Sequence, residues 1–192
     1  MTQSNEEENG PIGGPIGTGL VTVATNRSID TGAAAAEIAT VLEENGCEVV
    51  MQEHIDSDYD KIQSVVSRLV DRDDVDMIVT SGGTSIEPED ATLEAVDPLI
   101  EKDLTAFSEL FTTVAYEEFG TQVVAARTAA GVSEEVPVFC LPGNRDAVRL
   151  GLEEIILPEA RHLVILAREG TSEESSETET GTTEGEENDA DE

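Results

Sequence analysis

Apolar residues along this chain occur either in short continuous runs or at the three- and four-residue spacing of a helix. Segments of these two kinds alternate through the central region. Four short runs rich in Val, Ile and Leu predict buried strands. These runs are Leu20–Ala24, Glu48–Met51, Val75–Val79 and Val136–Leu141. Elsewhere, apolar residues three and four positions apart predict helices. The predicted helices cover residues 32–45, 58–71, 104–118, 143–154 and 155–167, the last broken near Pro158. This alternation predicts an α/β fold with a mostly parallel sheet covered on both faces.

The predicted helices carry signals for their ends and for their buried faces. Asp58 is a candidate N-cap, because a short carboxylate accepts hydrogen bonds from the first N–H groups of a helix. The pair Asn45-Gly46 predicts a helix end in the left-handed conformation. In the helix over residues 104–118 the predicted inward stripe is Phe107, Leu110, Phe111 and Val114.

Composition divides the 192 residues into three parts. Residues 1–18 are acidic and then rich in Gly and Pro, so we expect a disordered arm. Residues 19–168 form one domain, which is long enough for a sizeable core. Residues 169–192 consist largely of Ser, Thr, Glu and Gly, and this composition predicts a disordered acidic tail.

The formal net charge of the chain is −33, and the acidity is not confined to the tail. Residues 169–192 contribute 11 acidic side chains, while the other residues carry 32 acidic against ten basic side chains. This surface predicts a salt-adapted, haloarchaeal-like source, because molar salt shortens the range of self-repulsion to about 3 Å. The alternative is a chain that binds basic partners. Nucleic acid is a poor partner, since no basic stripe is present to neutralise phosphates.

Cysteine usage and the start of the chain favour a cytoplasmic protein. Cys47 and Cys140 form no CxxC or CxxH spacing, which favours two reduced, buried thiols over a disulfide framework or a metal site. His54 and His162 are isolated, so we expect structural roles for both. No apolar run approaches the ~20 residues needed to span a bilayer. The acidic run Glu6-Glu7-Glu8 stands where a signal peptide would carry basic residues.

A glycine turn follows the apolar run that ends at Val79. It consists of Thr80, Ser81, Gly82, Gly83, Thr84 and Ser85, with Asp90 and Thr92 just beyond. Glycines at the end of a strand let the backbone approach a ligand closely. The hydroxyl and N–H groups could hold an anion, and Asp90 could hold a metal that bridges to it. In the alternative interpretation the glycines only form a turn, and Asp90 caps a helix that begins near Thr92.

A second glycine turn, Pro142-Gly143-Asn144, follows the apolar run that ends at Leu141. Because the carboxyl ends of parallel strands meet at one edge of a sheet, we expect the two turns to lie close together. The sequence therefore predicts a binding site at this edge.

These segments together resemble the MoaB/MogA family of molybdenum cofactor biosynthesis proteins, from about Leu20 to Ala167. The first turn with Asp90-Ala91-Thr92 is similar to the family's TxGGT(G/S)…D(V/A)T. The other matching segments are Phe107-Ser108-Glu109-Leu110-Phe111, Glu118-Phe119-Gly120-Thr121, Ala126-Arg127, Ala130-Gly131 and Leu141-Pro142-Gly143-Asn144 with Ala147-Val148. Each motif is weak alone, and their order and spacing make the resemblance specific.

The resemblance implies a three-layer α/β/α, MogA-like fold that assembles as a trimer or a pair of trimers. It implies binding of molybdopterin, and in MogA-type members its adenylylation by Mg-ATP, with hand-over to a MoeA-type molybdenum insertase. It implies that Asp90 is a catalytic or Mg²⁺-binding carboxylate. The substrate-binding residues that it implies are Thr80, Ser81, Gly82, Gly83, Thr84, Ser85, Glu109, Arg127, Pro142, Gly143 and Asn144.

The chain also departs from the family pattern at several positions. Thr25 and Ser57 stand where the family has aspartates. Thr112, Ala115 and Arg145 stand where Arg, Ser and Pro are common. The departures are compatible with an active adenylyltransferase that uses neighbouring groups. They equally fit a MoaB-type protein that binds the pterin without catalysis.

Two polyanionic substrates require a locally positive pocket on this acidic chain. The candidates are Arg27, Arg127, Arg145 and Arg149, with Mg²⁺ and salt relieving the remaining repulsion.

Overall fold

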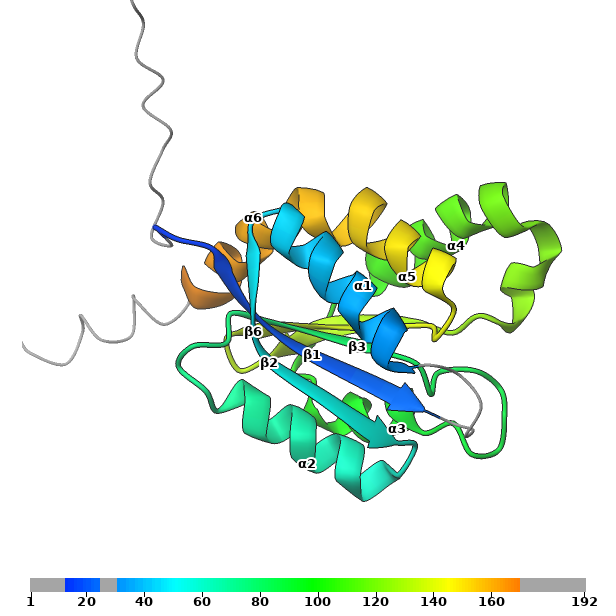
Figure 1. The fold of residues 1–192 in the computed structure, drawn as a ribbon, viewed down its shortest axis with the longest axis horizontal. Helices are drawn as coiled ribbons and strands as arrows, with labels where there is room; N and C mark the ends of the chain where they lie inside the picture. Colours follow the sequence, from blue (N-terminus) through cyan, green and yellow to red (C-terminus); the bar gives the residue numbers. More distant parts are fainter. Residues whose placement is uncertain (1–12, 25–30, 170–192) are drawn as a thin grey trace, which may run out of the picture.

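A six-stranded sheet runs through the centre of the molecule in the computed structural model, which describes residues 13–24 and 31–169 (Figure 1). Its strands stand in the order β2-β1-β3-β6-β5-β4. Their bounds are β1 Ile16–Ala24, β2 Cys47–Asp56, β3 Met77–Ser81, β4 Lys102–Asp103, β5 Ala129–Ser133 and β6 Val136–Leu141. The predicted arm over residues 1–12 and the tail over residues 170–192 lie outside the described residues.

The sheet is mostly parallel, as the sequence predicts. β1 pairs in parallel with β2 and β3, and β3 pairs in parallel with β6. β5 and β4 continue the sheet in antiparallel fashion, and the pattern of apolar residues predicts neither of them. The fold class is confirmed, with a mixed edge added to a parallel core.

Helices cover both faces of the sheet and make the fold three-layered (Figure 1). One face carries α1 (Thr31–Glu44), α4 (Thr105–Phe119), α5 (Arg145–Gly151) and α6 (Leu157–Glu169). The other carries α2 (Tyr59–Val70) and the short α3 (Thr92–Val96). Shorter turns are η1 (Asp97–Leu99), η2 (Gly120–Ala125) and η3 (Leu152–Ile156). None of the described helices is both long and apolar enough to cross a membrane.

Each face of the sheet has its own apolar core. Leu20, Phe111 and Phe139 are buried on the α1 side, and Phe139 packs against Phe107 with ring centroids 5.4 Å apart. Ile62 and Ile78 are buried on the α2 side. Neighbouring residues of a strand point to opposite faces, so strand alternation decides which core a side chain enters.

Asp58 caps α2, as predicted, because its Oδ1 accepts a hydrogen bond from Lys61 N at 2.9 Å. The predicted break near Pro158 is wrong. Helical structure continues from α5 through η3 into α6. A proline inside a helix removes one backbone hydrogen bond and crowds the preceding turn. Here the wider π-helical turn η3 ends at Ile156, and Pro158 is the second residue of α6, so this turn accommodates the irregularity.

The predicted inward position of Leu110 is also wrong, since this side chain is 53% exposed. The buried stripe of α4 is Phe107, Phe111 and Ala115, which follow one another at four-residue spacing. Leu110 therefore lies beside this stripe, on the outer surface of α4.

The first strand begins earlier than the predicted boundary between arm and domain at residue 18. Ile16 to Thr18 belong to β1, and Ile16 is buried. Asp76 anchors this end of the strand, because its Oδ2 accepts a hydrogen bond from Gly17 N at 2.6 Å. Its Oδ1 lies 2.6 Å from Nη2 of Arg168 in α6. One carboxylate thus joins the first strand to the last helix.

Candidate functional site

The two glycine turns meet at the carboxyl edge of the parallel strands, as the sequence predicts. Gly82 N donates a hydrogen bond to Leu141 O at 3.0 Å, which ties the end of β3 to the end of β6. A Cβ atom on Gly143 would lie 3.2 Å from Gly82 Cα, so the two backbones nearly touch. Strand ends that converge in this way form the ligand crevice of open α/β sheets.

The first turn requires glycine for steric reasons. Gly82 has φ +97° and Gly83 has φ +63°, a region that residues with a Cβ atom rarely adopt. A Cβ atom on Gly82 would lie 2.1 Å from Val23 O. The turn is therefore packed directly against the end of β1.

The four hydroxyl residues of the first turn differ in burial. The side chain of Thr80 is fully buried, and its Oγ1 has no hydrogen-bond partner among the described residues. Thr80 pairs in register with Cys140 on the face that α2 covers, so its side chain belongs to the core. Ser81 and Thr84 are also buried, and Ser81 Oγ donates to Pro142 O at 3.3 Å. Ser85 is half-buried at the surface of the turn.

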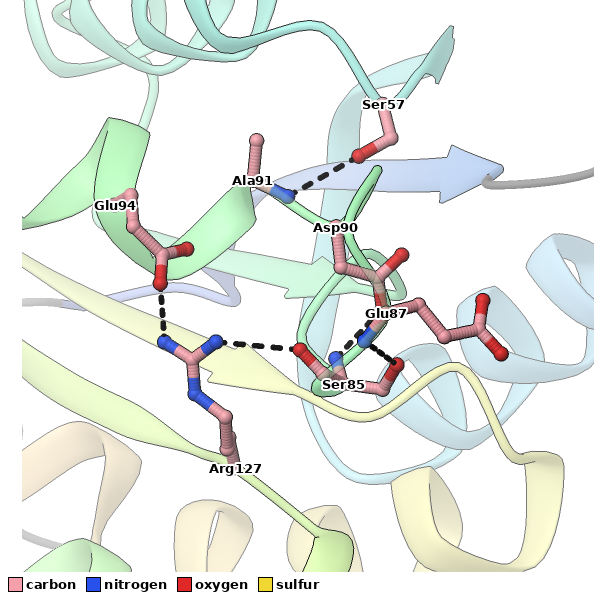
Figure 2. A network of polar contacts seen from close by, with 7 residues as sticks. All are labelled: Ser57, Ser85, Glu87, Asp90, Ala91, Glu94 and Arg127. Carbon is pink, nitrogen blue, oxygen red and sulfur yellow. Dashed lines mark hydrogen bonds and ion pairs between the residues drawn. The ribbon is translucent and has the colours of Figure 1, made fainter.

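Asp90 closes the segment that follows the glycines (Figure 2). Its Oδ2 accepts a hydrogen bond from Ser85 N at 2.6 Å, and its own N–H donates to Glu87 O at 3.0 Å. Asp90 does not cap the next helix, because α3 begins at Thr92 with Ala91 as its N-cap residue. The helix-cap interpretation of Asp90 is therefore wrong, and the structure gives this carboxylate a turn-closing contact instead.

Two hydroxyl side chains connect this segment to its surroundings. Thr92 Oγ1 donates to Gly82 O at 2.8 Å, and Thr92 N donates to Gly83 O at 2.8 Å. From the loop before α2, Ser57 Oγ donates to Glu89 O at 2.7 Å. It also accepts from Ala91 N at 3.3 Å (Figure 2). Thr25, the other position where the resemblance implies an aspartate, lies outside the described residues.

Arg127 approaches the same segment from the opposite side (Figure 2). Its Nη1 donates to Ser85 O at 3.2 Å, and its Nη2 forms a short ion pair with Glu94 of α3. The hydrogen bond from Arg127 lowers the pKa of Glu94, although burial opposes this shift. Sequence reasoning missed Glu94, because no motif distinguishes it from the many other acidic residues.

Two other predicted substrate-binding residues have structural contacts. Asn144 is the N-cap of α5, and its Oδ1 accepts from Ala147 N at 3.1 Å. The spacing of Asn144 before an apolar helix was a signal that could have identified this cap. Glu109 is exposed on α4, and none of the contacts found in the described part of the chain joins it to the turn.

Three of the four arginines predicted to form a positive pocket lie among the described residues, and each of the three is paired with a carboxylate. Arg145 pairs with Glu37 at 2.9 Å, and Arg149 pairs with Glu153 at 2.9 Å. Arg127 is paired with Glu94, and Arg27 lies outside the described residues. The charge of each of these three described arginines is therefore already balanced by a carboxylate.

An apolar cavity of about 150 Å³ opens beside the second turn. Its walls include Phe111 and Phe119 from α4 together with Pro142. The other lining residues are Ala115, Gln122, Val123, Ala126, Asn144 and Ala147. Apolar and aromatic walls next to a glycine turn suit a ligand that carries a planar ring and an anionic group.

The described residues form no group of three or more His, Cys, Asp or Glu side chains that could hold a metal ion. Cys47 and Cys140 are both buried, as predicted, and burial raises the pKa of the Cys140 thiol to about 11. Asp90 is a carboxylate in direct contact with the first turn, through Ser85 N. A single carboxylate fits a magnesium ion that arrives with phosphates, because Mg²⁺ commonly has only one or two protein carboxylates.

The fold and the site define a class: three-layer α/β proteins with a glycine-turn site at the carboxyl edge of the sheet. A family model described as "Probable molybdopterin binding domain" matches residues 16–162. The chain belongs to this MoaB/MogA family of molybdenum cofactor biosynthesis proteins, which confirms the resemblance.

Individual relatives agree with this assignment. Molybdenum cofactor biosynthesis protein B of Bacillus cereus is 34% identical over 145 residues, covering 75% of this chain and 86% of that protein. A crystal structure of molybdenum cofactor biosynthesis protein B is 32% identical with a TM-score of 0.76, covering 80% of this chain and 96% of that one. The crystal structure of the tungsten cofactor synthesizing protein MoaB of Pyrococcus furiosus is 32% identical with a TM-score of 0.71. The match covers 81% of this chain and 98% of that one. The Bacillus relative is bacterial, so it lends no support to the predicted haloarchaeal-like source.

Proposed function

We propose that this chain acts in molybdenum cofactor biosynthesis by binding molybdopterin and adenylylating its phosphate with Mg-ATP before metal insertion. The observation that carries the proposal is the contact between the two glycine turns, Gly82-Gly83 and Pro142-Gly143, with the Asp90 carboxylate on the same loop. Family membership supplies the substrate. The product would then pass to a MoeA-type insertase in the cytoplasm.

In the proposed reaction, a phosphate oxygen of molybdopterin attacks the α-phosphorus of ATP. The bond between this phosphorus and the bridging oxygen breaks, and pyrophosphate leaves. Such a transfer depends on positioning and on neutralising charge. The glycine turn allows close approach of the backbone, and Ser85 lies at its surface. Asp90 would hold the Mg²⁺ of Mg-ATP, and this ion neutralises charge on the phosphates.

The cavity beside the second turn fits the ring of such a substrate. Phe111, Phe119 and Pro142 would contact the faces of a pterin or an adenine, while the turns contact the phosphate. Ser81 and Thr84 are buried and support the turn, and we assign Thr80 to the core.

A second candidate is a non-catalytic MoaB-type molybdopterin carrier. The pairing of Arg127, Arg145 and Arg149 with carboxylates favours it, because free cations normally stabilise the charge of a transferring phosphoryl group. Incubation with molybdopterin and Mg-ATP in molar KCl separates the two candidates. Pyrophosphate release that requires molybdopterin supports the enzyme. Molybdopterin binding without pyrophosphate release supports the carrier. Absence of both molybdopterin binding and pyrophosphate release would contradict both candidates.

We also propose a homotrimer or a pair of trimers. Leu110 and Tyr116 of α4 and Val124 of η2 are exposed apolar side chains, which an interface between copies would cover. Light scattering should then give a mass three or six times the 20.4 kDa of one chain. A monomeric mass would contradict this proposal.

We expect folding to depend strongly on salt, in keeping with a salt-adapted source. Residues 1–168 carry a net charge of −22, and dilution lengthens the screening distance from about 3 Å at 1 M to about 30 Å at 0.01 M. The melting temperature should rise by about 10 °C between dilute buffer and 2 M KCl. Sucrose is the control, because it favours compact states without screening charge. Equal melting temperatures in dilute and molar KCl would contradict the expectation.

A further inference from the structure

The turn formed by residues 85–90, here called the Asp90 turn, is held from both sides by side chains outside the glycine motifs. We propose that Arg127, Glu94 and Ser57 are positioning residues that fix the Asp90 turn before substrate binds. The inference rests on the proposed function and deepens it. It also gives Arg127 a role other than the substrate contact that the resemblance implies.

The first set of contacts forms a closed ring (Figure 2). Asp90 Oδ2 accepts from Ser85 N at 2.6 Å, and Ser85 O accepts from Arg127 Nη1 at 3.2 Å. Arg127 Nη2 pairs with Glu94, and Glu94 lies four residues after Asp90 in the chain. Both polar groups of the Ser85 backbone are thus engaged, one by the candidate catalytic carboxylate and one by Arg127.

The second contact comes from the opposite side of the Asp90 turn. Ser57 Oγ donates to Glu89 O at 2.7 Å and accepts from Ala91 N at 3.3 Å, so it holds the residues on either side of Asp90. A hydroxyl group can donate and accept, whereas an ionised carboxylate can only accept. Serine is therefore suited to this place in a way that aspartate is not, and the departure at Ser57 becomes part of the positioning system.

The exposure of the ion pair favours positioning over a contribution to global stability. The side chains of Arg127 and Glu94 are 36% and 49% exposed, and exposed ion pairs contribute little to the free energy of unfolding. Arg127 is also occupied by a carboxylate and a carbonyl oxygen before any phosphate arrives. Its guanidinium group therefore acts on the substrate through Ser85 and Asp90.

Amide hydrogen exchange of Ser85, measured by NMR in molar KCl without substrate, tests the ring directly. Glu94→Ala and Arg127→Met should make this exchange about three- to tenfold faster, the effect expected for one weakened hydrogen bond. Ser57→Ala should do the same at Ala91. Glu87→Ala is the matched control, because it removes a charge from the same turn. Among the described residues, Glu87 contacts Ser85 and Asp90 through its backbone, and alanine keeps these backbone groups. Unchanged exchange at Ser85 in both ring variants would overturn the proposal, as would equal acceleration of core amides.

Kinetics gives the second measurement. In Glu94→Ala and Ser57→Ala, kcat should fall about tenfold with KM for ATP nearly unchanged, because misplacing a reacting group slows the chemical step. Ser57→Thr should restore kcat, and Ser57→Asp should not. A raised KM with unchanged kcat in Arg127→Met would show direct substrate contact and overturn the role of Arg127. A wild-type chain without turnover would overturn the proposed function alone, because amide exchange still decides on the positioning residues.

Discussion

Asp90→Asn is expected to lower the rate of molybdopterin adenylylation by about 10²–10³-fold while the fold stays intact. The substitution removes the negative charge that would hold Mg²⁺ near the transferred phosphoryl group. It keeps a side-chain oxygen that can accept from Ser85 N, the bond that Asp90 Oδ2 makes at 2.6 Å. Pyrophosphate release in molar KCl measures the rate, and thermal melting measures the fold.

Asp58→Asn is the matched control for this experiment. Asp58 also accepts one backbone hydrogen bond, from Lys61 N at 2.9 Å, and Asn caps helices about as well as Asp. Both variants lose one charge from an acidic chain, so a difference in turnover reports on the site. Unchanged turnover in Asp90→Asn would exclude a catalytic or metal-holding role. Molybdopterin binding should persist, because the glycine turns remain.

Gly82→Ala is expected to reduce the free energy of unfolding by about 2–4 kcal/mol. The alanine would have to adopt an unfavourable backbone conformation at φ +97°. Its Cβ atom would lie 2.1 Å from Val23 O. β1 and β3 would have to separate at the site, so ligand binding should weaken as well. Denaturant unfolding in molar KCl gives the loss of stability.

Gly46→Ala separates the two causes of this loss. Gly46 has a similar φ of +82°, but nothing lies within 4 Å of a Cβ atom built there. Only the conformational cost remains, about 1–2 kcal/mol. If both variants lost the same stability, the close approach of Gly82 to Val23 would have no energetic consequence.

The parallel part of the fold could be predicted because each of its strands contains a short run of apolar residues. β6 begins and ends where the sequence places it, at Val136 and Leu141. The antiparallel edge could not be predicted in the same way. β4 contains two residues, and β5 reads Ala-Ala-Gly-Val-Ser, which has too few large apolar side chains to form a pattern. Both depend on pairing with β6 and its neighbours rather than on their own sequence.

The site was predictable where topology alone decides it. Two strands that run in parallel must end at the same edge, so the meeting of Gly82 and Gly143 follows from the fold. The roles of individual side chains depend on finer detail. Because side chains alternate along β3, Thr80 points into the core. The side chain of Asn144 is engaged as the N-cap of α5. Glu94 belongs to no motif, so its pairing with Arg127 becomes evident only in the three-dimensional structure.

The contact of Asp76 with Gly17 and Arg168 has a practical consequence for handling the protein. It joins the start of β1 to the end of α6, side by side in Figure 1, at the amino edge of the sheet. The glycine turns lie at the carboxyl edge, a full strand length away. An affinity tag, a fluorescent label or a surface linker attached beyond either residue 16 or residue 169 therefore leaves from the side remote from the ligand crevice. Immobilised protein should keep that crevice open to solution.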